Sequence, residues 1–309
     1  MTKQDFMEQL IEELYRYFSP EQYQLEGSVL LKNNDTKRYA ILLKKIEGTV
    51  SPTIYLDNFY SEFEHGRTTI SETASHIYEQ MHDFEDKIEA YQEFSAELSD
   101  CSNKITYRLV SKERNKQFLD SVPHLPFLNM AVVFYIIHHV SKEGMESICV
   151  TNELAGKWGL SAKSLYIIAE KNTPILLPPI IDTMEHTLEL LMGEINCAIE
   201  PAKDSNKPIP MHIMTNKYQI NGASVLLYHG LLDGLAEKLG TDLYVIPSSI
   251  HEVILVPESG TEDTNLNDMV AEVNHTQVDP KEVLADHVYY YDRKEDHMIS
   301  CVHEDICYC

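Results

Sequence analysis

The segment Leu243–Pro257 constrains the fold more than any other part of this chain. It contains two short apolar runs, rich in valine and isoleucine, that meet at a Pro-Ser-Ser turn. Short runs of this composition, bounded by turn residues, predict buried strands rather than helices. His251 and Glu252 follow the turn, so polar and reactive side chains lie between two segments that must be buried.

Pairs of strand-like runs recur along the chain, and helices follow them in clusters. Glu26–Lys32 and Arg38–Lys45 flank Asn33-Asn34-Asp35, whose residues tolerate the positive φ of a tight turn and predict a hairpin. The sequence shows no alternating strand–helix series with a glycine-rich phosphate loop, which argues against Rossmann and P-loop folds. The pattern predicts an α+β fold, with mixed or antiparallel sheets flanked by helices in two to three subdomains.

Local signals mark the helices. Apolar residues recur at helical spacing from Thr2 until Pro20, and Thr69 precedes Glu72 by three residues, as in a capping box. Further helices are expected at Lys112–Leu119, Glu153–Trp158, Ser161–Glu170, Leu231–Leu239, Asn265–Val273 and just after Pro280. Further strands are expected at Pro52–Leu56, Ile105–Val110, Met130–Ile137, Ser147–Val150, His212–Asn216, Ala223–Tyr228 and Val288–Tyr291.

The length of 309 residues predicts more than one compact unit. Glu200–Pro210 lacks periodicity and is rich in proline and charge, so it predicts a boundary or an exposed loop. We expect an N-terminal unit over residues 1–100, a middle unit over 101–200 and a C-terminal unit over 211–292. Residues 293–309 are expected to form a flexible tail rich in cysteine and histidine.

The chain is strongly acidic, with 49 Asp and Glu against 25 Lys and Arg and a formal charge of −24. Such a charge repels phosphate backbones, so we expect no nucleic acid to bind. It keeps a protein soluble, and it also favours a basic protein partner or cations. The apolar runs are too short to span a bilayer, and the acidic N-terminus is unlike a signal peptide, so we expect no membrane association and a cytoplasmic location.

One constellation has the residue types of a hydrolase. Ser249 and His251 are two residues apart on an expected strand, so their side chains face the same way, and Ser248 is adjacent. A nucleophilic serine needs a histidine within hydrogen-bond reach and a carboxylate behind it, which Asp286 could supply. Turn chemistry explains Pro-Ser-Ser equally well, and no Gly-x-Ser-x-Gly motif surrounds either serine.

The C-terminal tail concentrates possible zinc ligands in Cys301, His303, Cys307 and Cys309. Their spacing matches neither a zinc knuckle nor a ribbon, so we expect no metal and no other cofactor. The six cysteines of the chain are mostly isolated, which is typical of reduced thiols rather than a disulfide framework.

Several segments carry a resemblance to a known family. They are Ser51–Tyr60, Val122–Val133, Val150–Asn152, Lys171–Pro174, Ile246–Val253 and Asp286–Asp292. Taken together they resemble an uncharacterised family, the domain-of-unknown-function family number 5688, found mainly in gut Firmicutes. The resemblance implies a bacterial, cytosolic protein and supplies no catalytic residues.

Two functional hypotheses follow. For each motif that could carry out chemistry, an ordinary structural role explains the same residues at least as well. The sequence therefore favours a non-enzymatic interaction or regulatory module. The alternative is a hydrolase-like enzyme that uses Ser248 or Ser249 with His251. The sequence leaves both the enzymatic question and the oligomeric state open.

Overall fold

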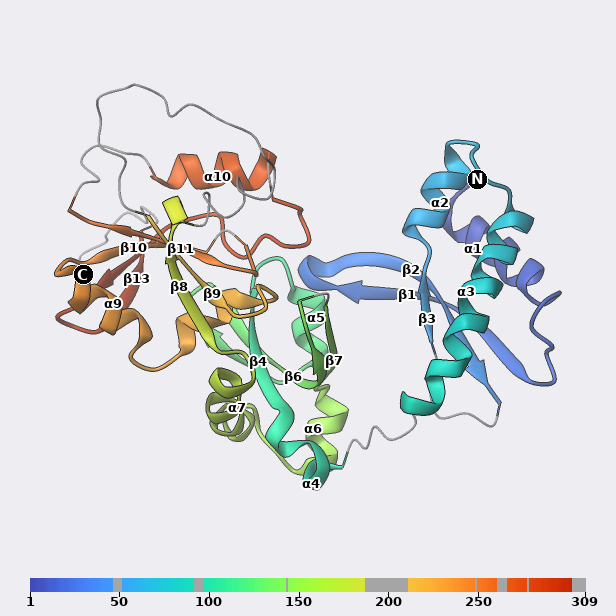
Figure 1. The fold of residues 1–309 in the computed structure, drawn as a ribbon, viewed down its shortest axis with the longest axis horizontal. Coiled ribbons are helices and arrows are strands. Elements are labelled where there is room, and N and C mark those ends of the chain that lie inside the picture. Colours follow the sequence, from blue (N-terminus) through green and yellow to red (C-terminus); the bar gives the residue numbers. More distant parts are fainter. Residues whose placement is uncertain are drawn as a thin grey trace. The chain divides into compact units, whose positions relative to one another are not determined.

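The computed structural model describes most of the chain. The described residues are 1–46, 52–91, 97–142, 144–186, 211–247, 249–259, 266–276 and 278–301. They fall into two compact units, Met1–Ala96 and Glu97–Cys309 (Figure 1). The strands of the described residues form three antiparallel sheets, and helices pack against them, so the fold is α+β as the sequence predicts.

The N-terminal unit contains a three-stranded sheet with the order β1-β2-β3. Its elements are α1 (Lys3–Leu14), β1 (Tyr23–Lys32), β2 (Thr36–Lys45), β3 (Thr53–Tyr55), α2 (Asp57–Glu64) and α3 (Ile70–Tyr91). The hairpin expected around Asn33-Asn34-Asp35 is present, and Asn34 has the left-handed backbone that the turn requires (φ 61°). The capping box at Thr69 is also present, because Thr69 Oγ1 accepts from the Glu72 N–H while the Glu72 carboxylate accepts from the Thr69 N–H.

The core of this unit lies between α1, α3 and one face of the hairpin. Phe6, Leu10 and Leu14 of α1 are fully buried with Ile41 of β2 and Leu56. The spacing of the α1 residues is the helical stripe that the sequence shows after Thr2, so amphipathic periodicity alone positions this helix. The short helix α2 was not expected from the sequence.

The C-terminal unit contains two sheets. The first has the order β4-β6-β5, with β7 also paired to β6, and the second has the order β13-β12-β10-β11-β9-β8. The elements around the first sheet are α4 (Leu98–Cys101), β4 (Ile105–Ser111), α5 (Lys116–Ser121), β5 (His124–Phe127), β6 (Met130–Val140), β7 (Met145–Cys149), α6 (Asn152–Trp158) and α7 (Ala162–Leu176). Those around the second are β8 (Pro179–Thr183), β9 (His212–Asn216), α9 (Leu231–Leu239), β10 (Leu243–Ile246), β11 (Val253–Pro257), α10 (Leu266–Thr276), β12 (Tyr289–Asp292) and β13 (His297–Ser300).

The constraining segment behaves as expected. Its two runs are β10 and β11, which pair antiparallel with Leu243 opposite Pro257. They lie in the middle of the six-stranded sheet, and Val245, Val253 and Leu255 are fully buried. The joint between them therefore lies at one end of two deeply buried strands.

Several expected elements differ in the structure. Helix α1 ends at Leu14 rather than near Pro20, and α5 begins at Lys116 rather than Lys112. Ala223–Tyr228 is not a strand, because Gly222–Leu227 forms a 3₁₀ helix, η3. Helix α7 does not end at Glu170, ahead of the Asn172-Thr173-Pro174 segment that predicts a stop, since it continues through Pro174 to Leu176. The chain after Pro280 forms a turn rather than a helix, and Asp279 caps that turn by accepting from the Lys281 N–H.

Local patterns fail at these places because contacts from distant elements decide the conformation. Ser224 of η3 donates to the Asn221 carbonyl and accepts from the Leu109 N–H of β4, which fixes a tight helical turn. In α7, the Asn172 side chain donates to the carbonyls of Ser102 and Ile105. These contacts hold the last turn of α7 in place despite the missing N–H of proline.

The predicted boundary at Glu200–Pro210 lies outside the described residues. On either side of that stretch, β8 and β9 are neighbours in one sheet, with Pro179 opposite Asn216. The tail expected from residue 293 onward begins with a strand, because β13 pairs with β12. Its remainder after Cys301 lies outside the described residues.

Candidate functional site

The predicted serine–histidine cluster lies at the joint between β10 and β11. Ser249 forms an isolated β-bridge with Val283, and its Oγ accepts from the backbone N–H of His251 at 3.0 Å. The His251 ring accepts from the Asn221 N–H through Nδ1 at 3.3 Å, and its Nε2 lies 3.8 Å from a Glu282 carboxylate oxygen. No contact of the described residues joins the Ser249 hydroxyl to the His251 ring.

The other members of the predicted hydrolase site do not complete it. Asp286 is bound elsewhere, because its carboxylate lies 2.6 Å from Arg114 and accepts from the Asn274 side chain. Ser248 lies outside the described residues. His251 instead takes part in packing, since its carbonyl accepts from the Thr215 hydroxyl at 2.7 Å.

Among the weak metal candidates, only Cys301 lies in the described part of the chain. Burial raises the pKa of its thiol, which opposes the thiolate form that zinc binds. His303, Cys307 and Cys309 lie outside the described residues. Within the described ranges, no group of three or more His, Cys, Asp or Glu side chains could hold a metal ion, and the described cysteines carry thiols rather than disulfides.

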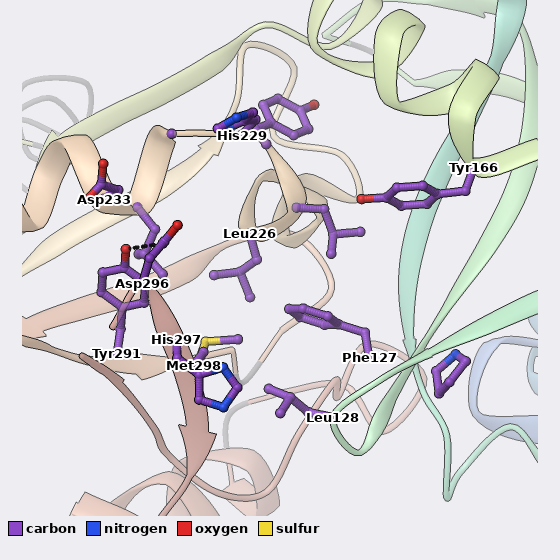
Figure 2. Close-up of a pocket in the computed structure, with 15 residues that line it drawn as sticks. Phe127, Leu128, Tyr166, Leu226, His229, Asp233, Tyr291, Asp296, His297 and Met298 are labelled. Carbon is purple, nitrogen blue, oxygen red and sulfur yellow. Dashed lines mark hydrogen bonds between the residues drawn. The ribbon is translucent and has the colours of Figure 1, made fainter. Parts of the chain in front are cut away.

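A cavity of about 480 Å³ within the C-terminal unit was not expected from the sequence. Figure 2 shows its two walls, with Phe127, Leu128 and Tyr166 opposite Asp233, Tyr291 and Asp296. Its lining consists of Pro126, Phe127, Leu128, Tyr166, Leu226, Leu227, Tyr228, His229, Gly230, Leu232, Asp233, Tyr291, Asp296, His297 and Met298. The volume is in the range of known ligand pockets, so we take this cavity as the candidate site.

Three turns build this cavity, and each has a lining residue in the left-handed region. Leu128 (φ 54°) lies between β5 and β6, Gly230 (φ 72°) joins η3 to α9, and Asp296 (φ 46°) lies between β12 and β13. This conformation is common for glycine but strained for a branched residue such as leucine. Strained backbone of this kind concentrates at functional sites, because the surrounding structure must hold it in place.

The aromatic wall is held from behind by Tyr107, which is fully buried. The Tyr166 ring stacks on Tyr107 with centroids 5.7 Å apart, and the Tyr228 ring meets Tyr107 edge-on at 6.3 Å. The Tyr228 hydroxyl donates to the Leu177 carbonyl at 2.8 Å, which fixes its ring. Offset stacking and edge contacts are the favoured geometries of aromatic pairs, so the wall is preformed.

The opposite wall is acidic. The Tyr291 hydroxyl donates to Asp296 at 2.6 Å. Burial raises the pKa of Tyr291, and the negative charges of Asp296, Asp233 and Glu237 raise it further, so three carboxylates act on one phenol. The lining contains no lysine or arginine, and the carboxylates of Asp233 and Glu237 form no ion pair or hydrogen bond within the described residues.

A hydrogen-bond network outside the lining positions the β5–β6 turn. Asn129, next to Leu128, accepts from the Tyr289 hydroxyl, and its amide nitrogen lies 2.7 Å from His287 Nε2. Its carbonyl accepts from the Lys112 N–H. Because β12 carries Tyr289, this network ties one wall of the cavity to the strand that carries Tyr291 of the other wall.

The scan against protein families matches residues 3–293 to the model described as a family of unknown function, DUF5688. The chain belongs to this family. The family match covers most of the cavity lining, while Asp296, His297 and Met298 lie beyond its end. No curated protein and no solved structure matches the chain. In the described ranges, no helix has the length and apolar character needed to cross a membrane.

Proposed function

We propose that this member of the family is a binding module rather than an enzyme, and that its cavity takes a basic segment of a partner protein. The observation that carries the proposal is the composition of the two walls. One wall is aromatic, and the other places the carboxylates of Asp233 and Asp296 near Tyr291, with no lysine or arginine among the described lining residues. Asp233 is half-buried and its carboxylate forms no ion pair or hydrogen bond within the described residues, so it is an available acceptor for a basic side chain of a partner.

The two walls suit the two parts of a lysine or arginine side chain. Phe127 and Tyr166 offer apolar surface to its alkyl stem and π-faces to its charge. Asp233 and Asp296 offer carboxylate oxygens to its N–H groups, and charge-assisted hydrogen bonds of this kind are the stronger ones. Arginine fits best, because its planar guanidinium stacks on rings and binds a carboxylate with two N–H groups.

The charge of the whole chain supports the same partner. A formal charge of −24 attracts a basic segment before contact and speeds its association. Binding of this kind weakens as salt screens the charges, so the affinity should fall as ionic strength rises.

The test is calorimetric titration of the full chain with a tetra-arginine peptide. We expect Asp233→Asn and Asp296→Asn each to weaken binding about five- to tenfold, since each removes one charge contact of about 1 kcal/mol. Asp120→Asn is the matched control, because Asp120 is an exposed aspartate of α5 outside the cavity lining and its substitution changes the net charge equally.

Two results would contradict the proposal. One is the absence of binding to tetra-arginine at low ionic strength. The other is an equal loss of affinity for Asp120→Asn and Asp233→Asn, because binding would then follow the net charge rather than the cavity. Tetra-glutamate, a peptide of opposite charge, should not bind.

We also propose a bacterial cytoplasmic location, which the acidic charge and the thiol form of the described cysteines support. Fractionation of a native host with an antibody against the chain tests it, and recovery from the membrane or the culture medium would refute it.

A further inference from the structure

The strand β1 lies at one edge of its sheet, and over most of its length its outer backbone groups have no partner among the residues that the structure describes. In the sheet order β1-β2-β3, only β2 pairs with β1 among the described residues. An exposed edge of this kind is a template for another strand, so proteins usually shorten, bend, charge or cover it.

The hydrogen bonds of the sheet show which residues of β1 face outward. Leu43 donates to the Pro52 carbonyl, and the Tyr39 carbonyl accepts from Leu56, so odd-numbered residues of β2 point to β3. The even-numbered residues of β2 therefore point to β1, and the register pairs them with even-numbered residues of β1. Odd-numbered residues of β1 thus direct their N–H and C=O groups to the free edge.

One contact confirms this direction and shows where the edge is covered. The Leu25 N–H donates to the Tyr15 hydroxyl at 3.1 Å. Gly27, Val29 and Leu31 have no such partner in the described part of the unit. By contrast, the outward N–H groups of β4 are bound at Tyr107 by the Thr173 hydroxyl and at Leu109 by the Ser224 hydroxyl.

The side chains of this part of β1 do not protect it either. Between Glu26 and Lys32 the sequence is Gly-Ser-Val-Leu-Leu, without charge or proline. Val29 is 42% exposed and Leu31 is 36% exposed, because helix α1 covers the strand only as far as Gly27, where Met7 lies against it. The segment is an uncharged run with Glu26 at one end and Lys32 at the other. In an antiparallel pair of two such segments, the acidic end of each lies beside the basic end of the other.

We propose that β1 pairs antiparallel with β1 of a second copy of this chain, with Val29 opposite Val29 at the twofold axis. Gly27 then lies opposite Leu31 of the second copy, so that outward-facing residues meet outward-facing residues. In this register Glu26 lies opposite Lys32 of the second copy, and the symmetry makes that ion pair twice. The two three-stranded sheets become one continuous sheet.

Charge selects this register among the alternatives. Outward-facing residues of the two copies meet only when the register is shifted in steps of two residues, because the direction of the backbone groups alternates along a strand. The neighbouring registers place Glu26 opposite Leu30 or opposite Asn34, and both lose the ion pair. Cross-strand pairs of opposite charge stabilise antiparallel strands, and like charges destabilise them.

The surroundings of the edge are compatible with two copies of an acidic chain. The hairpin from Lys32 to Lys45 has five basic residues and one acidic residue, so its surface is locally positive in a chain with charge −24. Lys32 is exposed, with its ammonium 4.8 Å from the Tyr55 ring centroid, and the proposed pairing requires this flexible side chain to turn from Tyr55 to Glu26 of the second copy. Glu26 is exposed and has no ion pair among the described residues.

The experiment is sedimentation equilibrium of the full chain and of charge-reversed variants. We expect the natural chain to form dimers, and Glu26→Lys and Lys32→Glu each to weaken dimerisation at least about tenfold, since each places like charges opposite each other twice. An equimolar mixture of the two variants should recover dimers, because the two substituted side chains, one basic and one acidic, then face each other across the interface. The double variant Glu26→Lys with Lys32→Glu should also dimerise.

Val29→Pro supplies a second test that leaves the β1–β2 ladder intact, because the N–H that it removes points to the free edge. We expect this variant to be a monomer with an unchanged circular dichroism spectrum. A natural chain that stays monomeric up to the highest concentration at which it is soluble would overturn the proposal. So would a dimer that Val29→Pro and both charge reversals leave unchanged, since it would use another surface.

Discussion

At the scale of single residues, Gly222 shows how closely the elements of the C-terminal unit approach one another. A Cβ at this position would collide with the Thr215 hydroxyl oxygen and the His251 carbonyl oxygen. Those two oxygens take part in the hydrogen bond that joins β9 to the joint after β10. Glycine is therefore required here because no room exists for a Cβ, and not because of a positive φ.

Gly222→Ala is expected to lower the free energy of unfolding by about 1–3 kcal/mol, the usual cost of overpacking a rigid site. Gly234→Ala is the matched control, because Gly234 lies inside α9 and a Cβ there meets no atom within 4 Å. It should be stabilising by about 0.5–1 kcal/mol, since alanine favours a helix over glycine. Urea denaturation of both variants measures the difference, and equal effects would show that Gly222 is not confined.

Residue-level predictions succeed where the cause is local in the sequence. Thr69 caps α3 as expected because its partner, Glu72, is three residues away. Ser161 caps α7 for the same reason. The residues next to Gly222 in the sequence do not indicate that Thr215 and His251 pack against it. The need for glycine at this position therefore appears only when the strands are packed together.

At the scale of elements, Thr173 is one of the side chains that join α7 to the edge strand β4. The Thr173 hydroxyl donates to the Ala169 carbonyl at 2.6 Å and accepts from the Tyr107 N–H at 3.2 Å, and the residue is fully buried. This contact satisfies an N–H of the edge strand β4 and also holds the last turn of the helix before Pro174. The sequence pattern Asn-Thr-Pro suggested an end at this point because it carries no information about β4.

Thr173→Val is expected to cost about 1–3 kcal/mol of unfolding free energy, because the shape is kept while a buried N–H loses its acceptor. Thr276→Val is the matched control, since Thr276 makes the same kind of bond, to the Glu272 carbonyl, at an exposed position. We expect its effect to stay within about 0.5 kcal/mol. Denaturation curves that do not separate the two variants would mean that water replaces the buried contact.

At the scale of the whole molecule, two half-buried histidines couple stability to pH. Burial lowers the pKa of His212 and of His287, although Asp286 partly opposes the shift at His287. The unfolded chain therefore takes up protons at a higher pH than the folded chain. Stability contributed by the neutral rings is complete above about pH 6.5 and is lost as the pH falls below it.

We expect the free energy of unfolding to fall between about pH 7.5 and pH 5, and His287→Gln to flatten part of that fall. Glutamine keeps an acceptor for the Asn129 side chain but does not titrate in this range. Denaturation at several pH values measures the slope, and a slope that His287→Gln leaves unchanged would assign it to other groups.

The whole-molecule fold was predictable in class, because paired strands and clustered helices are local patterns. The cavity was not, because its walls come from three turns that lie far apart in the sequence. Leu128 carries no local signal for its left-handed backbone, and neither Asp296 nor Gly230 shows in the sequence that its turn faces the other two. The serine–histidine cluster is a prediction from the closeness of its residues in the sequence. That closeness does not determine which atoms the side chains contact.

Hydrogen exchange with and without tetra-arginine tests most directly the claim that this cavity binds a basic segment. We expect slower exchange in the described amides of all three turns together, around Leu128, Gly230 and Asp296. Amides around Asp120 on α5 should exchange unchanged. Protection confined to other parts of the chain, or to only one of the three turns, would contradict it.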